Sequence, residues 1–191
     1  MDREAAPRAG AVRGSESGIG RSTARWAEAV SDDLRRGRGP LLDRRRRVAA
    51  LSLGAIGALG GVAAYQTGLV RHLPEPPLPL FDAERVDASG EAYRFSGTPD
   101  AALGIASYAA TLALAGMGTR NRAREQPWIP LALAAKVLLD AAGGVYLGLE
   151  QATKHRRFCS WCVAAAAASA AMVLQVLPEA RLALGHVTRR G

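Results

Sequence analysis

Residues 158–177 read FCSWCVAAAAASAAMVLQVL and place the only two cysteines of the chain, Cys159 and Cys162, at the start of a long apolar segment. The segment carries no charge and is about 20 residues long, the length of a helix that crosses the hydrocarbon core of a bilayer. The stretch before it, Lys154-His155-Arg156-Arg157, is basic and polar. The pattern predicts a thiol pair at the water-facing mouth of a membrane helix.

Three further apolar blocks of similar length precede this one. Each is rich in Ala, Gly and Leu and poor in aromatic residues, which favours helices packed closely through small side chains, as at Gly57 and Gly61. The mean hydropathy of the whole chain is only +0.01, because charged tails and loops dilute the blocks. We predict an all-α integral membrane four-helix bundle, with a soluble alanine-rich helical bundle as the alternative. The predicted spans are residues 48–67, 99–118, 128–149 and 159–177.

The arginines predict the orientation of this bundle, because the cytoplasmic flanks of membrane helices carry an excess of Lys and Arg. Residues 1–47 hold 12 arginines, and the connection 119–127 holds three more. The connection 70–98 has three arginines against five acidic residues, which fits the outer side, whereas the basic segment 150–158 is an exception. We expect a multi-pass protein of the cell inner (cytoplasmic) membrane with its N-terminus and C-terminus in the cytoplasm.

The chain divides into three predicted parts. Residues 1–47 lack a sustained helical or strand period and are expected to form a disordered basic cytoplasmic tail. Residues 48–184 form the four-helix membrane domain, and residues 185–191 form a short C-terminal tail. The first apolar run is too long for the h-region of a signal peptide, so the first span itself is expected to direct insertion. The net charge of +8 indicates contact with membrane lipid and no nucleic-acid partner.

The connection between the first two spans opens with a proline-rich run, Leu73 to Phe81. Such a run is stiff and extended and cannot be helical. We consider two roles for it, a lid across the mouth of the bundle and a plain connector. Thr98 is expected to cap the second span, with Pro99 at the first helical position.

The Cys-x-x-Cys spacing brings both sulfurs onto the first turn of a helix, within bonding distance of each other. Cys159 lies next to unpaired backbone N–H groups and basic residues, which favours its thiolate form. The outer side of the membrane is oxidising, so the compartment permits a disulfide. A redox-active pair, a static disulfide and buried structural thiols are the candidates. Zinc takes about four ligands and only His155 is near in sequence, so no metal site is predicted.

The chain resembles the vitamin K epoxide reductase family, particularly its small bacterial members, over roughly Val48 to Leu184. This resemblance implies a four-helix membrane core that passes electrons between thiols on the outer side and a quinone of the menaquinone or ubiquinone type. It further implies that Cys159 and Cys162 are the redox pair, with Cys162 nearer the quinone. The segments that carry the resemblance are Gly97-Thr98-Pro99, Leu103-Gly104-Ile105-Ala106-Ser107-Tyr108 and Phe158-Cys159-Ser160-Trp161-Cys162.

The chain departs from this family in its outer connection, because residues 70–98 contain no cysteine where well-studied members have a second pair. No thioredoxin-like domain follows the last span either. The expected partner is therefore an external thioredoxin-like dithiol protein that reaches Cys159 and Cys162 directly. We predict a membrane quinone-linked thiol–disulfide oxidoreductase. The alternative is a non-catalytic membrane scaffold with a structural disulfide.

Four further residues are candidates for contact with the quinone. Lys136 and Asp140 lie four residues apart on one face of the third span, where ionisable groups are costly and face the bundle interior or water. They form either a structural ion pair or a polar group near a quinone carbonyl. Trp161 and Tyr146 are simpler to explain by interfacial anchoring and packing, and they are kept as candidates for quinone contact.

Overall fold

The computed structural model describes residues 25–189, with the side chains from residue 27 onward. These residues are all-helical and contain no β-strand, apart from one isolated bridge between Phe81 and Phe158. They form seven α-helices, not four, together with a 3₁₀ turn and a π-helical segment. The elements are α1 (Arg25–Arg36), α2 (Pro40–Gln66), α3 (Ala83–Asp87), η1 (Gly90–Tyr93), α4 (Asp100–Gly116), α5 (Arg122–Glu125), α6 (Trp128–Glu150), η2 (Gln151–His155) and α7 (Ser160–Val187).

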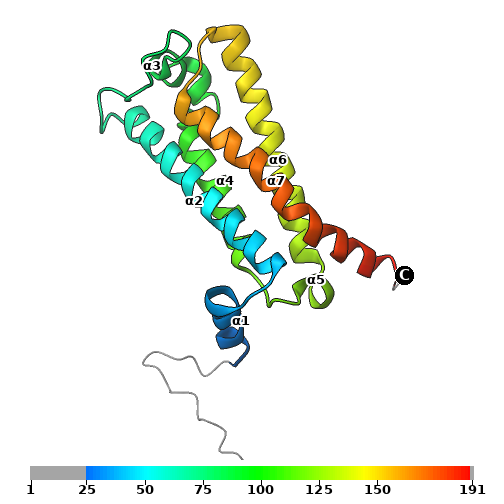
Figure 1. Ribbon diagram of the computed structural model, residues 1–191. Coiled ribbons are helices and arrows are strands. Elements are labelled where there is room, and N and C mark those ends of the chain that lie inside the picture. Colours follow the sequence, from blue (N-terminus) through cyan, green and yellow to red (C-terminus); the bar gives the residue numbers. More distant parts are fainter. Residues whose placement is uncertain (1–24, 190–191) are drawn as a thin grey trace, which may run out of the picture.

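The four long helices, α2, α4, α6 and α7, lie side by side and run alternately up and down (Figure 1). Helix α2 packs on α4 and α7, and α6 packs on the same two helices, so the four enclose one core. The short α3 lies with the start of α7 at one end of the molecule. At the opposite end lie α1, α5 and the end of α7. The core consists mainly of small and branched side chains, among them Val48, Val62, Leu133, Val137 and Met172.

Three of these helices are long and apolar enough to cross a membrane: α2, α6 continued through η2, and α7. Helix α4 is apolar but has only 17 residues, at the short end of the range for a membrane span. These apolar helices leave many leucines and valines exposed, which is typical of side chains that face lipid. The all-helical, apolar architecture agrees with the prediction.

The boundaries at the N-terminal side differ from those predicted. The expected disordered tail over 1–47 is wrong for residues 25–36, which form α1, and for residues 40–47, which form the start of α2. Residues 1–24 of that predicted tail lie outside the described residues. Helix α2 starts early, with Pro40 in its first turn. Proline is favourable there because the N–H groups of the first turn have no partner within the helix. The run Arg44-Arg45-Arg46-Arg47 is therefore helical, with side chains that reach neighbouring elements.

The last helix also extends beyond its prediction. The last span was expected to end at Leu177 and the C-terminal tail to begin at residue 185, but α7 contains Pro178 and continues to Val187. A proline inside a helix leaves the carbonyl four residues earlier without its usual N–H donor. That carbonyl belongs to Leu174, and Arg44 Nη1 donates a hydrogen bond to it at 3.0 Å. A side chain from α2 thus replaces the missing backbone donor and lets the helix continue.

Two buried arginines bind the carbonyl groups at the end of α4. Arg45 donates to the carbonyl oxygens of Ala115, Met117, Gly118 and Thr119 at 3.0–3.1 Å. Arg122, which is fully buried, donates to Leu114 and Met117 and forms two hydrogen bonds of 2.8 and 2.7 Å with the Glu179 carboxylate. The last carbonyls of a helix have no intrahelical donors, and cations there also oppose the helix dipole. These contacts fix α4 and α5 against α2 and α7.

The close packing expected at Gly57 and Gly61 is found elsewhere. A side chain at Gly57 would meet nothing, so this glycine lies in no tight interface. A Cβ at Gly61 would lie 3.6 Å from the Trp161 ring, which therefore packs on α2. Among the glycines of the four long helices, the tightest approach is at Gly104 of α4, where an added Cβ would lie 2.5 Å from Leu59 Cδ1. Spacing alone marks small residues but does not say which way they face.

Candidate functional site

The chain reverses direction between α6 and α7 through a π-helical turn and a left-handed residue. Helix α6 passes into η2, which ends at Arg156 with a φ of 52°. A non-glycine residue rarely adopts this conformation, and such residues cluster where a structure needs a fixed, sharp turn. The turn directs the chain back toward the bundle and places Cys159 immediately before the first residue of α7.

Cys159 is the N-cap of α7, and its sulfur accepts a hydrogen bond from the backbone N–H of Cys162 at 3.3 Å. Its side chain is completely buried, and its own N–H donates to Gln151 Oε1 of η2 at 3.1 Å. Cys162 lies one turn further along and is partly exposed. Both are free thiols in this structure. The sulfur of Cys159 is thus held at the positive end of a helix by a hydrogen bond that an anionic sulfur strengthens.

The proline-rich connection lies over the start of α7, as a lid would. Glu75 Oε1 accepts hydrogen bonds from the N–H and the hydroxyl of Ser160, at 2.9 and 2.8 Å. The Trp161 indole N–H donates to the carbonyl of Pro74 at 3.0 Å. Phe158 exchanges backbone hydrogen bonds with Leu80 and Asp82, each of 2.9 Å. The connection is attached to both residues between the cysteines, a position that suits the lid interpretation.

Helix α3 brings a buried carboxyl group to the thiols. Asp87 is only 1% exposed, and the sulfur of Cys162 lies 3.6 Å from its Oδ1. Its second oxygen, Oδ2, is buried without a hydrogen-bond partner among the described residues. Gln66 of α2 anchors this helix, because its amide donates to the Asp87 carbonyl at 3.3 Å and to Asp100 Oδ1 at 2.7 Å.

The surroundings of Asp87 favour its neutral form. Burial raises the pKa of its carboxyl group from 3.8 to about 6, and the nearby Asp100 raises it further, while hydrogen bonds with Cys159 and Cys162 oppose the shift. The carboxyl group therefore changes protonation within the physiological range. An acid of this kind beside a thiol is suited to exchange a proton with it.

Neither Asp87 nor Glu75 was picked out as a site residue from the sequence. Both lie in the connection 70–98, whose five acidic residues were counted only as a sign of the outer side. No motif distinguishes a carboxylate that contacts the thiols from one that faces water. In the structure Asp87 and Val86 are buried on α3, whereas the other acidic residue of this helix, Glu84, is half-buried and paired with His72.

A small cavity of about 50 Å³ adjoins Cys162. Its walls include Asp87, Asp100, Gln151 and the apolar Leu147. Ligand pockets for small molecules usually measure roughly 300–1,000 Å³, so this space does not hold a quinone ring as it stands. The lining offers both polar and apolar side chains, as a quinone ring with its two carbonyls would need, but the cavity is too small for that ring.

One oxygen of Asp87 and the two cysteine sulfurs lie within 4.8 Å of one another. These are three ligand atoms, one fewer than a closed structural zinc site uses. The expectation of no metal stays a prediction.

Lys136 and Asp140 form an ion pair with N and O 2.5 Å apart, inside a polar cluster between α4 and α6. The two oxygens of Asp140 accept hydrogen bonds from Ser107 at 2.8 Å and Thr111 at 2.9 Å. Lys136 also donates to Ser107 at 2.7 Å. Every strong partner of this pair is a side chain of α4 or α6, and none is a cysteine. The geometry matches the structural ion pair more closely than the quinone contact, which stays untested.

The remaining candidates lie in different surroundings. Trp161 lies between the cysteines, under the lid and over Gly61. Tyr146 is 57% exposed on α6 and is not among the residues that line the cavity beside Cys162. Tyr108, regarded as a packing residue, donates to the Ala165 carbonyl at 2.9 Å and is paired with Ser169 at 2.7 Å, which links α4 to α7 below the thiols.

A comparison with protein families gives one match. The model described as the vitamin K epoxide reductase family matches residues 48–177, about two thirds of the chain. The matched range includes α4 and α6 entirely, most of α2 and α7, the lid and both cysteines. No curated protein matches this chain.

Proposed function

Because the chain belongs to the vitamin K epoxide reductase family, whose members are membrane oxidoreductases that couple thiols to quinones, we propose that Cys159 and Cys162 exchange electrons between a partner dithiol and a membrane quinone. The observation that carries this proposal is the pair itself. Two free thiols lie one turn apart at the start of a helix, beneath a lid and against a buried carboxyl group. A structural disulfide requires none of these surroundings.

In the oxidised enzyme the pair is a disulfide. A thiolate of the partner attacks the sulfur of Cys159, a mixed disulfide forms, and the sulfur of Cys162 leaves with the electron pair and takes up a proton. The second thiolate of the partner then attacks the mixed disulfide and releases Cys159 as a thiol. The partner loses two electrons and two protons, and the pair gains them. A quinone accepts two electrons and two protons when the pair is reoxidised to the disulfide.

Asp87 is proposed to hold the proton of Cys162 during reoxidation. Its Oδ1 lies within reach of the thiol, and its Oδ2 has no partner among the described residues that would compete for the proton. With a pKa of about 6, the carboxyl group is mainly ionised at neutral pH and takes the thiol proton without becoming permanently neutral. No loop cysteine is needed for this step.

Access to the pair requires movement of the lid. Cys159 is fully buried under the connection that Glu75 and Trp161 attach to the start of α7. The cavity beside Cys162 is too small for a quinone ring. We propose that the lid opens toward a thioredoxin-like dithiol protein on the outer side, since no cysteine within residues 70–98 can relay the electrons.

The proposed topology has four membrane spans, with α4 as the shortest, and both termini in the cytoplasm. The ionic contacts of the two ends support this orientation. At the end with the thiols, Lys154 is paired with Glu150 and Glu91, and Arg94 is paired with Glu150. These pairs weaken the basic character of residues 150–158, which were an exception to the arginine pattern. The opposite end keeps exposed arginines, as cytoplasmic flanks do.

Thiol alkylation of the reduced, detergent-solubilised protein, before and after addition of a quinone, tests this function. We expect rapid quinone-dependent loss of both free thiols. Cys162→Ser should abolish it, while Thr153→Ser, an exposed hydroxyl exchange on the same side, should not. Thiols that stay reduced with quinone would contradict the proposal. A disulfide that forms in air but never exchanges with dithiols would support the scaffold alternative.

A further inference from the structure

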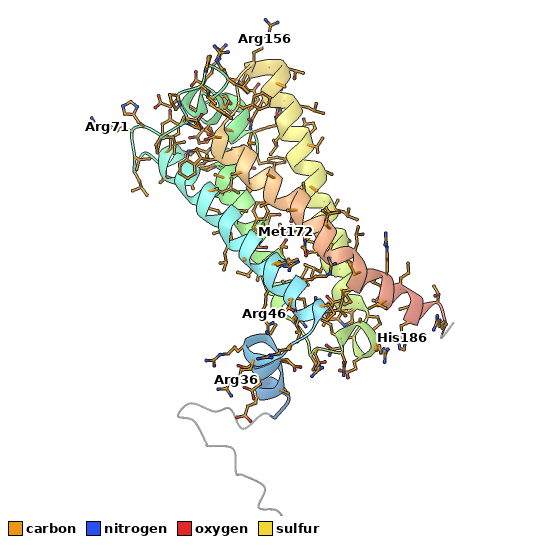
Figure 2. All side chains as sticks on the ribbon, viewed as in Figure 1. Arg36, Arg46, Arg71, Arg156, Met172 and His186 are labelled. Atoms are coloured by element: carbon orange, nitrogen blue, oxygen red, sulfur yellow. The ribbon has the colours of Figure 1, made fainter. Side chains whose placement is uncertain are left out.

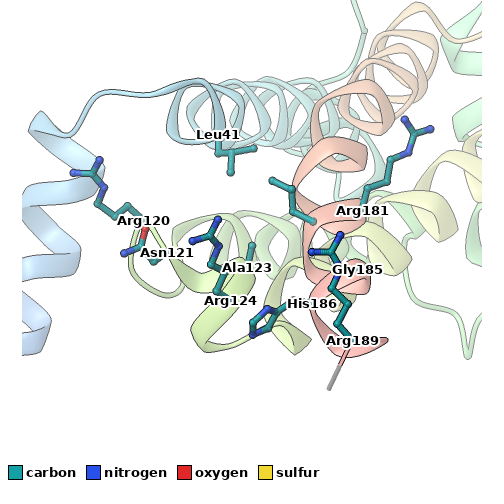
Figure 3. Close-up of a pocket in the computed structure, with 10 residues that line it drawn as sticks. Leu41, Arg120, Asn121, Ala123, Arg124, Arg181, Gly185, His186 and Arg189 are labelled. Carbon is teal, nitrogen blue, oxygen red and sulfur yellow. The ribbon is translucent and has the colours of Figure 1, made fainter. Parts of the chain in front are cut away.

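A second cavity lies at the end of the molecule opposite the thiols. It has a volume of about 480 Å³ and lies between the start of α2, the α4–α5 connection with α5, and the last turns of α7 (Figure 3). Figure 2 shows how far this region, around His186, is from the lid near Arg71 and Arg156. The proposed thiol chemistry makes no use of the cavity.

The walls of this cavity are fixed by buried contacts. Arg122 of α5 and Glu179 of α7 form their two hydrogen bonds directly behind it, and both are buried. Ala123, which lines the cavity, and Ala183, one turn after Glu179, are also buried. The α5 and α7 walls therefore keep their spacing, and the cavity is a built feature of the fold.

The lining is strongly basic. Arg120, Arg124, Arg181 and Arg189 line the cavity, and no acidic residue does. Within residues 27–189, none of these four guanidinium groups forms an ion pair or a hydrogen bond, in contrast to Arg122. Figure 3 shows Arg124 and His186 between Arg120 on one side and Arg181 on the other. Like charges gathered without counter-charges indicate a site for an anion.

His186 adds a directed hydrogen-bonding group. Its Nε2 is buried and has no hydrogen-bond partner among the described residues. A buried polar atom without a partner is uncommon, because leaving it unpaired costs free energy. Beside the arginines, this nitrogen is suited to a phosphate oxygen, which accepts hydrogen bonds from guanidinium and imidazole N–H groups.

Apart from Asn121, the rest of the lining is apolar or glycine and adjoins the long apolar helices. Leu41 and Leu182 lie beside the arginines, and Leu182 is exposed on α7. A small soluble anion would gain no binding free energy from contact with these leucines. A phospholipid brings both chemistries together, because its acyl chains lie along the apolar helices and its phosphate lies at their ends.

We infer that this cavity binds the phosphate headgroup of an anionic phospholipid. The ligand phosphate contacts Arg124, Arg189 and His186, while Leu41 and Leu182 contact the start of an acyl chain. The inference rests on the membrane placement of the helices and not on the thiol chemistry, so the two proposals can fail separately.

Thermal unfolding of the full-length protein in a neutral detergent, with added phosphatidylglycerol or phosphatidylcholine, tests the inference. The test variant is Arg124→Gln/Arg189→Gln, in which both changed side chains are exposed. The matched control is Arg35→Gln/Arg38→Gln, which removes the same charge at the same end but outside the cavity. We expect phosphatidylglycerol to raise the midpoint of the wild type and the control. The test variant should need a roughly 30-fold higher concentration of this lipid for the same rise in midpoint, since each arginine contributes about fivefold to the affinity.

Three results would overturn the inference. The first is equal stabilisation by phosphatidylcholine, because that lipid has no net charge. The second is an equal loss in the test variant and in the control, which would indicate general attraction to a basic surface. The third is the same stabilisation by inorganic phosphate at the same concentration, which would make the site one for a soluble anion. Native mass spectrometry of the same samples gives an independent measure of bound phosphatidylglycerol, which should be lost only from the test variant.

Discussion

The sulfur of Cys162 lies 3.6 Å from Oδ1 of Asp87, although 75 positions separate the two residues in the chain. The contact joins the first turn of α7 to the last residue of α3, where the Asp87 side chain is buried and Cys162 is partly exposed. It makes the carboxyl group of Asp87 the nearest proton acceptor for the thiol.

Asp87→Asn should remove the pH dependence near pH 6 from the rate of quinone-dependent thiol oxidation. In the wild type, quinone-dependent thiol oxidation should rise with pH and reach half its maximum near pH 6, because only the ionised carboxylate accepts the Cys162 proton. The amide accepts no proton, so the rate of the variant should no longer rise with pH through this range. Its thiol oxidation should be slower than that of the wild type by about 10²-fold or more. The measurement is the rate of thiol loss from pH 5 to 8. Glu84→Gln, on the same helix but paired with His72 and not with a thiol, should keep the wild-type profile.

The same substitution should stabilise the folded protein at neutral pH. The pKa of Asp87 is higher in the folded protein than in the unfolded chain, so the folded form binds more protons between about pH 4 and pH 6. Its stability therefore falls as the pH rises through that window, and the loss is complete above it. The shift corresponds to at most about 3 kcal/mol. Thermal midpoints in detergent at pH 4 and pH 7.5 should differ less in Asp87→Asn than in the wild type; an equal difference would refute the assignment.

Glu75→Ala should open the lid. The carboxylate accepts two hydrogen bonds from Ser160, and its loss leaves the start of α7 held mainly by the contacts of Trp161 and Phe158. We expect the fully buried Cys159 to react with a maleimide at least about tenfold faster in the reduced protein, because the loss of even one of the two hydrogen bonds corresponds to roughly 1.4 kcal/mol. Glu75→Gln keeps an acceptor oxygen, so its rate of maleimide reaction should lie between those of the wild type and Glu75→Ala. No change in either variant would mean that the lid is held elsewhere.

Asp140→Asn distinguishes the two interpretations of the cluster between α4 and α6. If the pair is structural, the variant leaves Lys136 without its counter-charge and lowers the thermal midpoint, while the rate per folded molecule stays the same. A residue beside the quinone would instead raise the quinone concentration needed for half-maximal rate. We expect the first result, because Asp140 is already occupied by Lys136, Ser107 and Thr111. Steady-state measurements over a quinone series, with the thermal midpoint, decide between them.

Arg122→Met and Glu179→Leu should each destabilise the protein more than the two together. Either single change leaves a buried charge without its partner, which costs about 3–5 kcal/mol, whereas removing both replaces a buried ion pair by apolar groups. The carbonyls of Leu114 and Met117 also lose their donor with Arg122, so the double variant should remain somewhat below the wild type. Thermal unfolding of the four proteins measures the coupling. Additive losses would show that the pair does not act as a unit.

The sequence by itself determined the features that depend on neighbours along the chain. Apolar blocks of membrane length predicted long helices, since a helix satisfies its own backbone groups whatever lies beside it. The spacing of Cys159 and Cys162 predicted that both sulfurs share one helical turn, and the motifs around them were sufficient to recognise the family.

Only the tertiary structure decided the contacts between distant segments. Asp87 and Glu75 were two of five similar acidic residues until the path of the loop placed them against α7. The continuation of α7 to Val187 depends on a partner in another element, because Arg44 of α2 donates to the carbonyl that Pro178 leaves free. Local patterns cannot encode these contacts, because burial and hydrogen bonding of a polar side chain depend on which segment packs against it. The position of the thiol pair on one helical turn thus follows from its spacing in the sequence, whereas the contact of Asp87 with Cys162 follows from the packing of α3 against α7.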